Sequence, residues 1–230
     1  MIRRMTAPAD PRPVFERYET LARDADAVFV RVKSEFSGCV TCHEGCSDCC
    51  HALFDLTLVE AAYLNGAFLR AFPPGAARSA VLERAYAADR QAHAFKRKAF
   101  KASQAGQDVD AVLEDMAKRR VRCPLLGDGE RCVLYEQRPV TCRVYGVPTA
   151  IAGKGHVCGK SAFERGRPYP TANLDRMHEK LLALSRDFAS HMQSGFSDIH
   201  TVLVPVSMAL ITAYDAAYYG ADRKGARKND

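Results

Sequence analysis

The sequence predicts a mostly α-helical fold, a helical bundle with two converging cysteine-rich loops. Apolar residues recur every three or four positions over several long segments, which is the spacing of a helix that buries one side. Nine cysteines lie in irregular stretches between those segments. With 230 residues, of which 47 % are hydrophobic, the chain can bury a core without disulfide bonds.

The first helix is expected from Pro13 to about Phe36, where the helical spacing of apolar residues ends at Ser37-Gly38. The residues before Pro13 are basic and rich in proline, and they contain no apolar stretch of the kind found in export signals. We therefore expect an N-terminal leader without structure of its own and a cytoplasmic location.

Two more helices are expected after the first cysteine stretch. Thr57-x-x-Glu60 has the spacing of a capping box and opens a helix from Leu58 to Phe72, which Pro73-Pro74-Gly75 ends. From Arg78 to about Gln104, mostly small apolar residues form a narrow stripe, which predicts a close helix neighbour. The stripe consists of Val81, Ala85, Ala88, Ala92, Phe95 and Ala99.

A fourth helix is expected from the capping residue Asp108 to about Arg122. Its predicted inner face consists of Val109, Val112, Leu113 and Met116.

The C-terminal part predicts two further helices. Asn173 or Asp175 begins the first, which runs through Met192. Ser197 caps the second, which contains Pro205 near its first turns and ends at Gly220. The expected divisions of the chain are 1–38 for the leader and first helix, 39–160 for a cysteine-cluster domain with inserted helices, 161–220 for C-terminal helices on the same core, and 221–230 for a disordered tail.

The cysteines form two clusters, Cys39-x2-Cys42-x3-Cys46-x2-Cys49-Cys50 and Cys123-x8-Cys132-x9-Cys142-x15-Cys158. Spacings of two and three let a short turn direct two thiolates at one ion. The expected reducing compartment disfavours disulfides, and free structural thiols normally scatter through apolar helices. The clusters therefore predict that the two loops form a metal site.

Cys49 and Cys50 are adjacent, and neighbouring side chains of an extended backbone point to opposite sides. We therefore expect the two thiols to face different centres, or one of them to be a redox or supporting thiol. His43 and His51 lie in the same cluster and are expected to be polar neighbours rather than ligands, because the thiolates supply enough donors.

The clusters resemble the YkgJ-type cysteine-cluster family, a zinc- or iron-chelating domain. The resemblance lies in the knot from Cys42 to Cys50, in Cys123-Pro124-x-Leu126, and above all in Cys132-Val-Leu-Tyr135-Glu-Gln-Arg138-Pro139-x-x-Cys142-Arg143. The family shares eight cysteines, and the resemblance implies that the metal ligands are Cys42, Cys46, Cys49, Cys50, Cys123, Cys132, Cys142 and Cys158. The three residues between Cys42 and Cys46 depart from the usual two, so Cys39 is an alternative to Cys42.

The donor set leaves the metal open. Four thiolates suit a zinc ion or an iron–sulfur cluster, and eight suit two zinc ions or one cluster with other thiols beside it. Arg138 and Arg143 flank Cys142, where a guanidinium can bond to sulfur or a carbonyl and offset the charge of thiolates. Pro124 and Pro139 stiffen the backbone beside their cysteines.

We therefore interpret the chain as a metal-binding protein, with an iron–sulfur cluster or Zn²⁺ as cofactor and a role in redox chemistry or metal handling. One alternative is a redox or protein-modifying enzyme, because flagellin lysine methylases contain a similar cysteine region. Another is a zinc-stapled module that binds nucleic acid or a protein partner.

Charge and hydropathy bear on the partners. The net charge of +6 is modest, and acidic residues alternate with the basic ones on the predicted helices, which is typical of a solvated surface. We therefore do not expect a nucleic-acid partner. The longest apolar run, Val202 to Ala213, is interrupted by Pro205 and is shorter than the ~20 residues that span a membrane.

Overall fold

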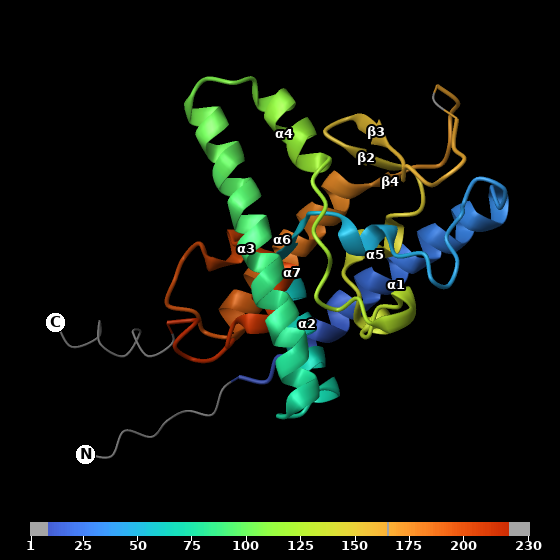
Figure 1. Cartoon of the computed structure of the whole chain (residues 1–230). Helices are drawn as coiled ribbons and strands as arrows, with labels where there is room; N and C mark the ends of the chain where they lie inside the picture. The colour runs from blue at the N-terminus through green and yellow to red at the C-terminus, as the bar shows by residue number, and fades with distance from the viewer. Residues whose placement is uncertain (1–8, 165, 221–230) are drawn as a thin grey trace, which may run out of the picture.

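The computed structural model describes residues 9–164 and 166–220. This part of the chain is mostly helical, which confirms the predicted fold class (Figure 1). The α-helices are α1 (Arg12–Glu35), α2 (Leu58–Ala71), α3 (Ala76–Gln104), α4 (Val109–Ala117), α5 (Val140–Val144), α6 (Leu174–His191) and α7 (Val206–Ile211). Short 3-10 helices are η1 (Asp48–His51), η2 (Asp128–Glu130), η3 (Tyr135–Gln137) and η4 (Ile199–Thr201). The strands are β1 (Asp55–Thr57), β2 (Thr149–Ile151), β3 (Lys154–His156), β4 (Ala172–Asn173) and β5 (Leu203–Pro205).

Helix α2 lies at the centre of the fold because it is buried on two sides. It begins at the predicted capping box, in which the Thr57 backbone N–H donates to Glu60 Oε2 at 3.2 Å. One hydrophobic cluster joins α2 to α1, α5 and α6, and a second joins it to α3, α7 and β1. Residues of α2 in the first cluster include Leu58, Val59 and Ala62, and those in the second include Leu64, Ala67 and Phe68.

The small-residue stripe of α3 packs as predicted over its first half. Val81, Ala85, Ala88 and Ala92 are buried, and α7 lies against this helix. Phe95 and Ala99 are only partly buried, because the far half of α3 extends beyond the core and pairs with α4 (Figure 1).

The prediction for α4 is wrong in length and in its inner face. Asp108 does cap the helix, because its Oδ1 accepts the Ala111 N–H at 2.9 Å, but the helix ends at Ala117 rather than near Arg122. Val109 and Leu113 are each 60 % exposed. The chain after α4 is extended because Arg120 pairs with Ala52 in an antiparallel bridge.

The C-terminal prediction is half right. Asn173 caps α6 by accepting the Arg176 N–H at 2.9 Å, as expected. The single helix from Ser197 to Gly220 does not form, and η4, β5 and α7 stand in its place. Strand β5 pairs antiparallel with β1, and Pro205 lies opposite Asp55. Pro205 is the last residue of the strand, a position that tolerates a residue without a backbone N–H.

A second, three-stranded sheet has the order β3-β2-β4, with β2 antiparallel to β3 and parallel to β4. Its β2–β3 hairpin leads the chain towards Cys158. The predicted leader before residue 9 and the predicted tail at 221–230 lie outside the described residues, and the domain divisions stay predictions. Within the described ranges, no helix has the length and apolar character needed to cross a membrane.

Candidate metal centre

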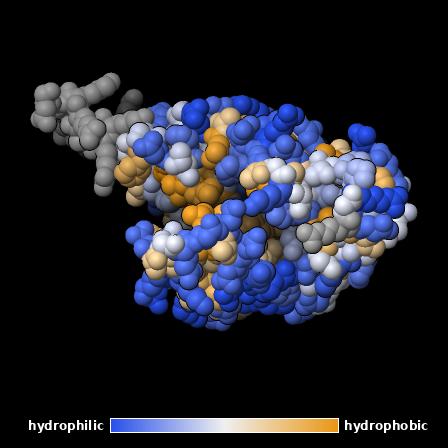
Figure 2. All heavy atoms as spheres, turned by 90° about the horizontal axis from the view of Figure 1, so that it is seen from above, coloured by the Kyte–Doolittle hydropathy of each residue, from blue (hydrophilic) through white to orange (hydrophobic). Residues whose placement is uncertain are grey.

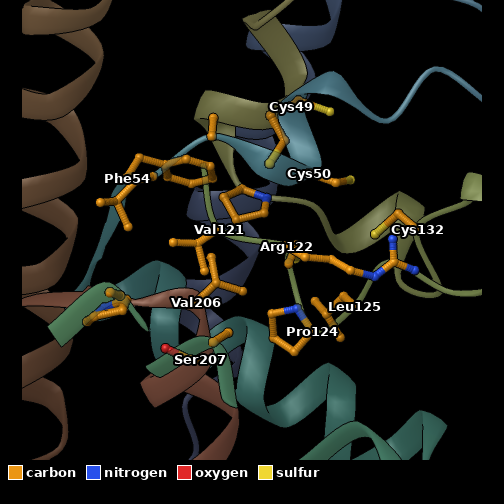
Figure 3. Close-up of a pocket in the computed structure, with 18 of the residues that line it drawn as sticks. Cys49, Cys50, Phe54, Val121, Arg122, Pro124, Leu125, Cys132, Val206 and Ser207 are labelled. Atoms are coloured by element: carbon orange, nitrogen blue, oxygen red, sulfur yellow. The ribbon is translucent and has the colours of Figure 1, made fainter. Parts of the chain in front are cut away.

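Five cysteines from both halves of the sequence line one pocket. Figure 3 shows Cys49 and Cys50 from the first cluster near Cys132 from the second, with Val206 and Ser207 of α7 across the pocket. The five cysteines, called the pocket thiols below, are Cys49, Cys50, Cys123, Cys132 and Cys142. All nine cysteines of the chain are free thiols in the structure.

Backbone pairing brings the two halves of the pocket together. The Cys123 N–H donates to the Cys50 carbonyl at 2.7 Å, and the Val121 N–H donates to the His51 carbonyl at 3.0 Å. A small hairpin then returns the chain, because the Val133 N–H donates to the Leu125 carbonyl at 2.9 Å and Cys132 bridges Leu126. These bonds satisfy loop backbone groups and place Cys50, Cys123 and Cys132 side by side.

Cys142 reaches the pocket from the short helix α5. Pro139 forms the N-cap of α5, and the first N–H of the helix, that of Val140, donates to Glu60 Oε1 at 3.1 Å. Glu60 is 4 % exposed and also accepts the Thr57 N–H, so one buried carboxylate starts α2 and fixes α5. Burial raises the pKa of the Cys142 thiol, and neighbouring Cys49, Cys123 and Cys132 raise it further.

Cys49 and Cys50 lie in the 3-10 turn η1 and not in the extended backbone assumed from the sequence. Both line the same pocket. Whether the two thiols face different centres, or one of them is a redox or supporting thiol, stays a prediction. A hydrogen bond from Cys50 lowers the pKa of Cys49, and the same bond raises the pKa of Cys50. Burial raises the pKa of Cys123 to about 12.

Four of the five pocket thiols line two hollows of different character. The first is an apolar cleft of about 60 Å³, lined among others by Phe54, Ala88 and Val206. The second is a polar cavity of about 360 Å³, whose lining includes His43 and Glu130. Cys49, Cys50, Cys132, Arg138 and Cys142 line both hollows. Hydrophobic residues also gather in a hollow between hydrophilic lobes on the face that Figure 2 shows.

The two arginines beside Cys142 bind oxygen atoms. Arg143, which is 7 % exposed, pairs with Asp26 of α1 and donates to the carbonyls of Arg138 and Glu136 at 2.9 and 2.5 Å. Arg138 donates to Asp26 at 3.0 Å and stacks on Tyr135, with its guanidinium 4.0 Å from the ring centroid. Their ion pairs with Asp26 hold the Cys142 segment against α1.

Three further cysteines, Cys42, Cys46 and Cys158, lie near one another and are called the outer thiols. Burial raises the pKa of Cys42 to about 11, and its neighbours Cys46 and Cys158 add to this effect. Cys158 Sγ donates to Asp48 Oδ2 at 3.4 Å. The Cys42 sulfur lies on the backbone of Gly146, where a Cβ atom would stand 2.2 Å from it.

Asp48 was not singled out from the sequence, yet it hydrogen-bonds to side chains from three other segments of the chain, namely Cys158, Tyr145 and Arg120. It accepts hydrogen bonds from the Tyr145 hydroxyl at 3.0 Å and from Arg120 at 2.7 Å. Burial acts to raise its pKa, but these bonds and the Arg120 charge hold it below the ordinary value. Its position between Cys46 and Cys49 in the sequence is the only signal that could have revealed it.

Cys39 and the two histidines of the first cluster lie outside both thiol groups. Cys39 packs against the core formed with α1, and it lines neither hollow. The Nδ1–H of His43 donates to the Glu44 carbonyl at 2.7 Å, and that of His51 donates to the Ser47 carbonyl at 3.1 Å. Both histidines therefore have local backbone partners.

The chemistry of the donors fits a metal better than their present arrangement does. Thiolates are the donors of structural zinc and of iron–sulfur clusters. Within residues 9–164 and 166–220, however, no three side chains of His, Cys, Asp or Glu form a group that could hold a metal ion as they stand. A cysteine sulfur moves by rotation about one bond, χ1, so a change of rotamer can redirect the thiols that already line one pocket.

Comparison with known families agrees with the cysteine pattern. A model of a family described as a putative zinc- or iron-chelating domain matches residues 41–159. This chain belongs to the CxxCxxCC family. The match confirms the resemblance to a cysteine-cluster family and supports metal binding in general. No curated protein and no solved structure matches the chain. The assignment of individual cysteines as ligands in this CxxCxxCC protein stays a prediction.

Proposed function

We propose that the pocket thiols bind a metal centre, an iron–sulfur cluster or zinc, that serves redox chemistry or metal handling. The observation that carries the proposal is the meeting of Cys49 and Cys50 with Cys123, Cys132 and Cys142 in one pocket. Four of these five thiols suffice for either centre. A thiolate centre requires reduced cysteines, which agrees with the expected cytoplasmic location.

The surroundings of the pocket thiols support this proposal. Cys50 and Cys123 are joined by a backbone hydrogen bond of 2.7 Å, and Cys142 lies on a helix fixed by Glu60 and Asp26. Fixing the backbone of the ligands beforehand reduces the entropy lost on binding. The Arg138 guanidinium lines the pocket and offsets the negative charge that thiolates bring.

The apolar cleft beside the thiols favours a second candidate, a redox or protein-modifying enzyme. Its lining of Phe54, Val121 and Leu125 would exclude water next to the centre. On this alternative the metal centre is a cofactor and the cleft receives the group that reacts. If the chain keeps its fold after the metal is removed, this result favours a functional metal centre over a metal that only stabilises the structure.

The direct test is anaerobic purification of the full chain, followed by iron, sulfide and zinc analysis. Brown protein with matching iron and sulfide identifies a cluster, and colourless protein with zinc identifies a zinc site. A folded protein that binds neither iron nor zinc under these conditions contradicts the proposal.

A pair of variants locates the centre. Cys142→Ser is expected to remove the pocket metal, because its thiol is held next to Cys49, Cys123 and Cys132. Cys39→Ser is the matched control, because Cys39 lines neither hollow, and it should retain the metal. Unchanged metal content in Cys142→Ser would refute its assignment as a ligand.

A further inference from the structure

We propose that two turns, residues 43–47 and residues 128–131, form a clasp that closes the mouth of the polar cavity and admits neutral and cationic molecules to its thiols more readily than anions. The inference concerns the route to the thiols and not what the thiols hold. It therefore does not depend on the proposed metal centre.

The polar cavity has an exposed rim and a partly buried floor. The exposed lining residues, which form the rim, are His43, Glu44, Gly45, Glu130, Arg131, Tyr135 and Glu136. The lining thiols, which form the floor, are only partly exposed and are Cys46, Cys49, Cys50, Cys132 and Cys142. With about 360 Å³, the cavity has the size of a small-molecule site. A molecule that enters by this mouth passes the rim before it meets a thiol.

Side-chain contacts join the two turns at the rim. Arg131 of the second turn pairs with Glu44 of the first at 2.7 Å. The Ser47 hydroxyl of the first turn donates to Glu130 Oε2 of the second. Arg122 donates to the other oxygen of the same carboxylate at 3.3 Å. The turns are therefore linked at two points, one an ion pair and the other a hydrogen bond.

The second turn contains a strained residue that its contact with the first turn holds in place. The Gly127 N–H donates to the Arg131 carbonyl at 2.8 Å and closes this turn. Glu130 has a φ of 57°, in the left-handed region that residues other than glycine seldom adopt. The hydrogen bond from Ser47 stabilises Glu130 in this conformation. Loss of that bond therefore favours a relaxed turn and an open mouth.

The ion pair between the turns is weak enough to break often. The side chains of Arg131 and Glu44 are 68 % and 72 % exposed, and ion pairs with this exposure contribute little to stability and are weakened by salt. The thiols of the floor are held independently of it, because the Cys123 N–H binds the Cys50 carbonyl at 2.7 Å. The clasp can therefore open without disturbing the floor of the cavity.

The charge of the rim favours neutral and cationic molecules. Most charged side chains of the lining have a partner, in the pairs Glu44–Arg131, Glu130–Arg122 and Arg138–Asp26. Glu136 also lines the cavity, and within residues 9–164 and 166–220 no ion pair includes its carboxylate. An anion that enters the mouth meets this uncompensated negative charge.

The test measures how fast iodoacetamide alkylates each thiol of the full chain, purified anaerobically, by mass spectrometry of its peptides. The variant Ser47→Ala/Arg131→Gln removes both links between the turns and leaves every cysteine in place. Alkylation of Cys46, which lines only the polar cavity, should become about 3- to 10-fold faster. Alkylation of Cys123, which lines only the apolar cleft, should stay the same. An unchanged rate at Cys46 overturns the clasp.

The matched control is Arg17→Gln, which also removes an exposed ion pair of 2.7 Å but lies on α1 and outside the lining of the cavity. It should leave the rate at Cys46 unchanged. Anything bound to the thiols slows alkylation alike in all these chains, because their cysteines are the same. A faster rate at Cys46 in a chain that binds neither iron nor zinc therefore supports the clasp and removes the proposed function.

The unmodified chain decides the case if the double variant does not fold. Added salt weakens the exposed pair of Arg131 with Glu44, so the rate at Cys46 should rise relative to the rate at Cys123. A constant ratio of the two rates overturns the clasp.

Iodoacetate tests the selection by charge, because it is an anion of nearly the same size as neutral iodoacetamide. Glu136→Gln should make alkylation of Cys46 by iodoacetate about 2- to 5-fold faster at low salt and leave alkylation by iodoacetamide unchanged. Glu136→Asp keeps the charge and should behave as the unmodified chain. An equal response of the two reagents to Glu136→Gln shows that the rim does not select by charge and overturns this part of the inference.

Discussion

The helical framework and the cysteine loops of this protein are held together by different forces. In the framework, Phe68 of α2 and Phe188 of α6 are buried to within 1 % exposure among other apolar side chains. In the loops, Cys50 pairs with Cys123 through the backbone, and Arg143 is held by Asp26 and two carbonyls. The framework is stabilised by apolar burial, whereas the loops depend on a few specific polar contacts.

This difference predicts where a bound metal should matter. Apolar packing in the framework needs no metal, so its loss should destabilise the chain equally with and without a chelator. A metal that binds only the folded loops adds stability by mass action, so damage there should depend on the metal supplied. The variants below test this division, from the largest expected effect to the smallest.

Phe68→Ala should have the largest effect. Its side chain is fully buried in the cluster that joins α2 to α3 and α7, so truncation should cost about 3–5 kcal/mol. The measurement is urea unfolding followed by circular dichroism, with and without chelator. Leu69→Ala is the control, because Leu69 is 45 % exposed and should cost much less. If the loss of stability in Phe68→Ala disappears when metal is supplied, the framework is not independent of the metal and the proposed division between framework and loops is wrong.

Glu60→Ala should come next and should affect both regions. It removes the capping box of α2 and leaves the buried Val140 N–H of α5 without an acceptor, for a combined cost of about 2–4 kcal/mol. Because α5 carries Cys142, metal affinity should fall as well. Unfolding and metal titration measure the two effects. Destabilisation with unchanged metal affinity would show that the Glu60 contact does not position Cys142.

Asp26→Asn should have a smaller effect that is concentrated in the loops. The change removes the charge that pairs with Arg138 and with the buried Arg143, at a cost of about 1–3 kcal/mol. Hydrogen exchange should increase in residues 135–144 and stay unchanged in α2. Asp187→Asn is the control, because its pair with Arg17 is exposed on both sides. Equal exchange in α2 and residues 135–144 would contradict a local role.

The helices could be predicted because their signals are local. The capping box at Thr57 and Glu60, the small-residue stripe of α3 and the N-cap Asn173 all appear in the structure. Local sequence signals did not predict the secondary structure of segments whose conformation depends on pairing with a distant part of the chain. The segment around Val204 became a strand because it pairs with β1, and Arg120 left the helical pattern because it pairs with Ala52.

The candidate site could be predicted as a set of cysteines but not as a spatial arrangement. Spacing alone did not show that Cys49 and Cys50 share a 3-10 turn, because that turn is closed by the Cys50 N–H and the Ser47 carbonyl at 2.8 Å. Asp48 and Asp26 escaped notice because their partners lie far along the chain: the partners of Asp48 are 72 to 110 residues away, and those of Asp26 are 112 and 117 residues away. Such contacts have no periodicity to reveal them.

Cys39→Ser should have the smallest effect, and for that reason it is the sharpest test of how the cysteines divide. Cys39 lies only three residues before Cys42, so sequence alone allows either to be the first ligand. In the structure Cys39 packs on the core beside α1 and lines neither hollow, and exchanging its thiol for a hydroxyl should cost less than about 1 kcal/mol. Metal analysis and urea unfolding, beside Cys42→Ser, provide the comparison. Loss of metal in Cys39→Ser with retention of metal in Cys42→Ser would show that Cys39, and not Cys42, is the first ligand, because removing a ligand weakens the binding of its metal.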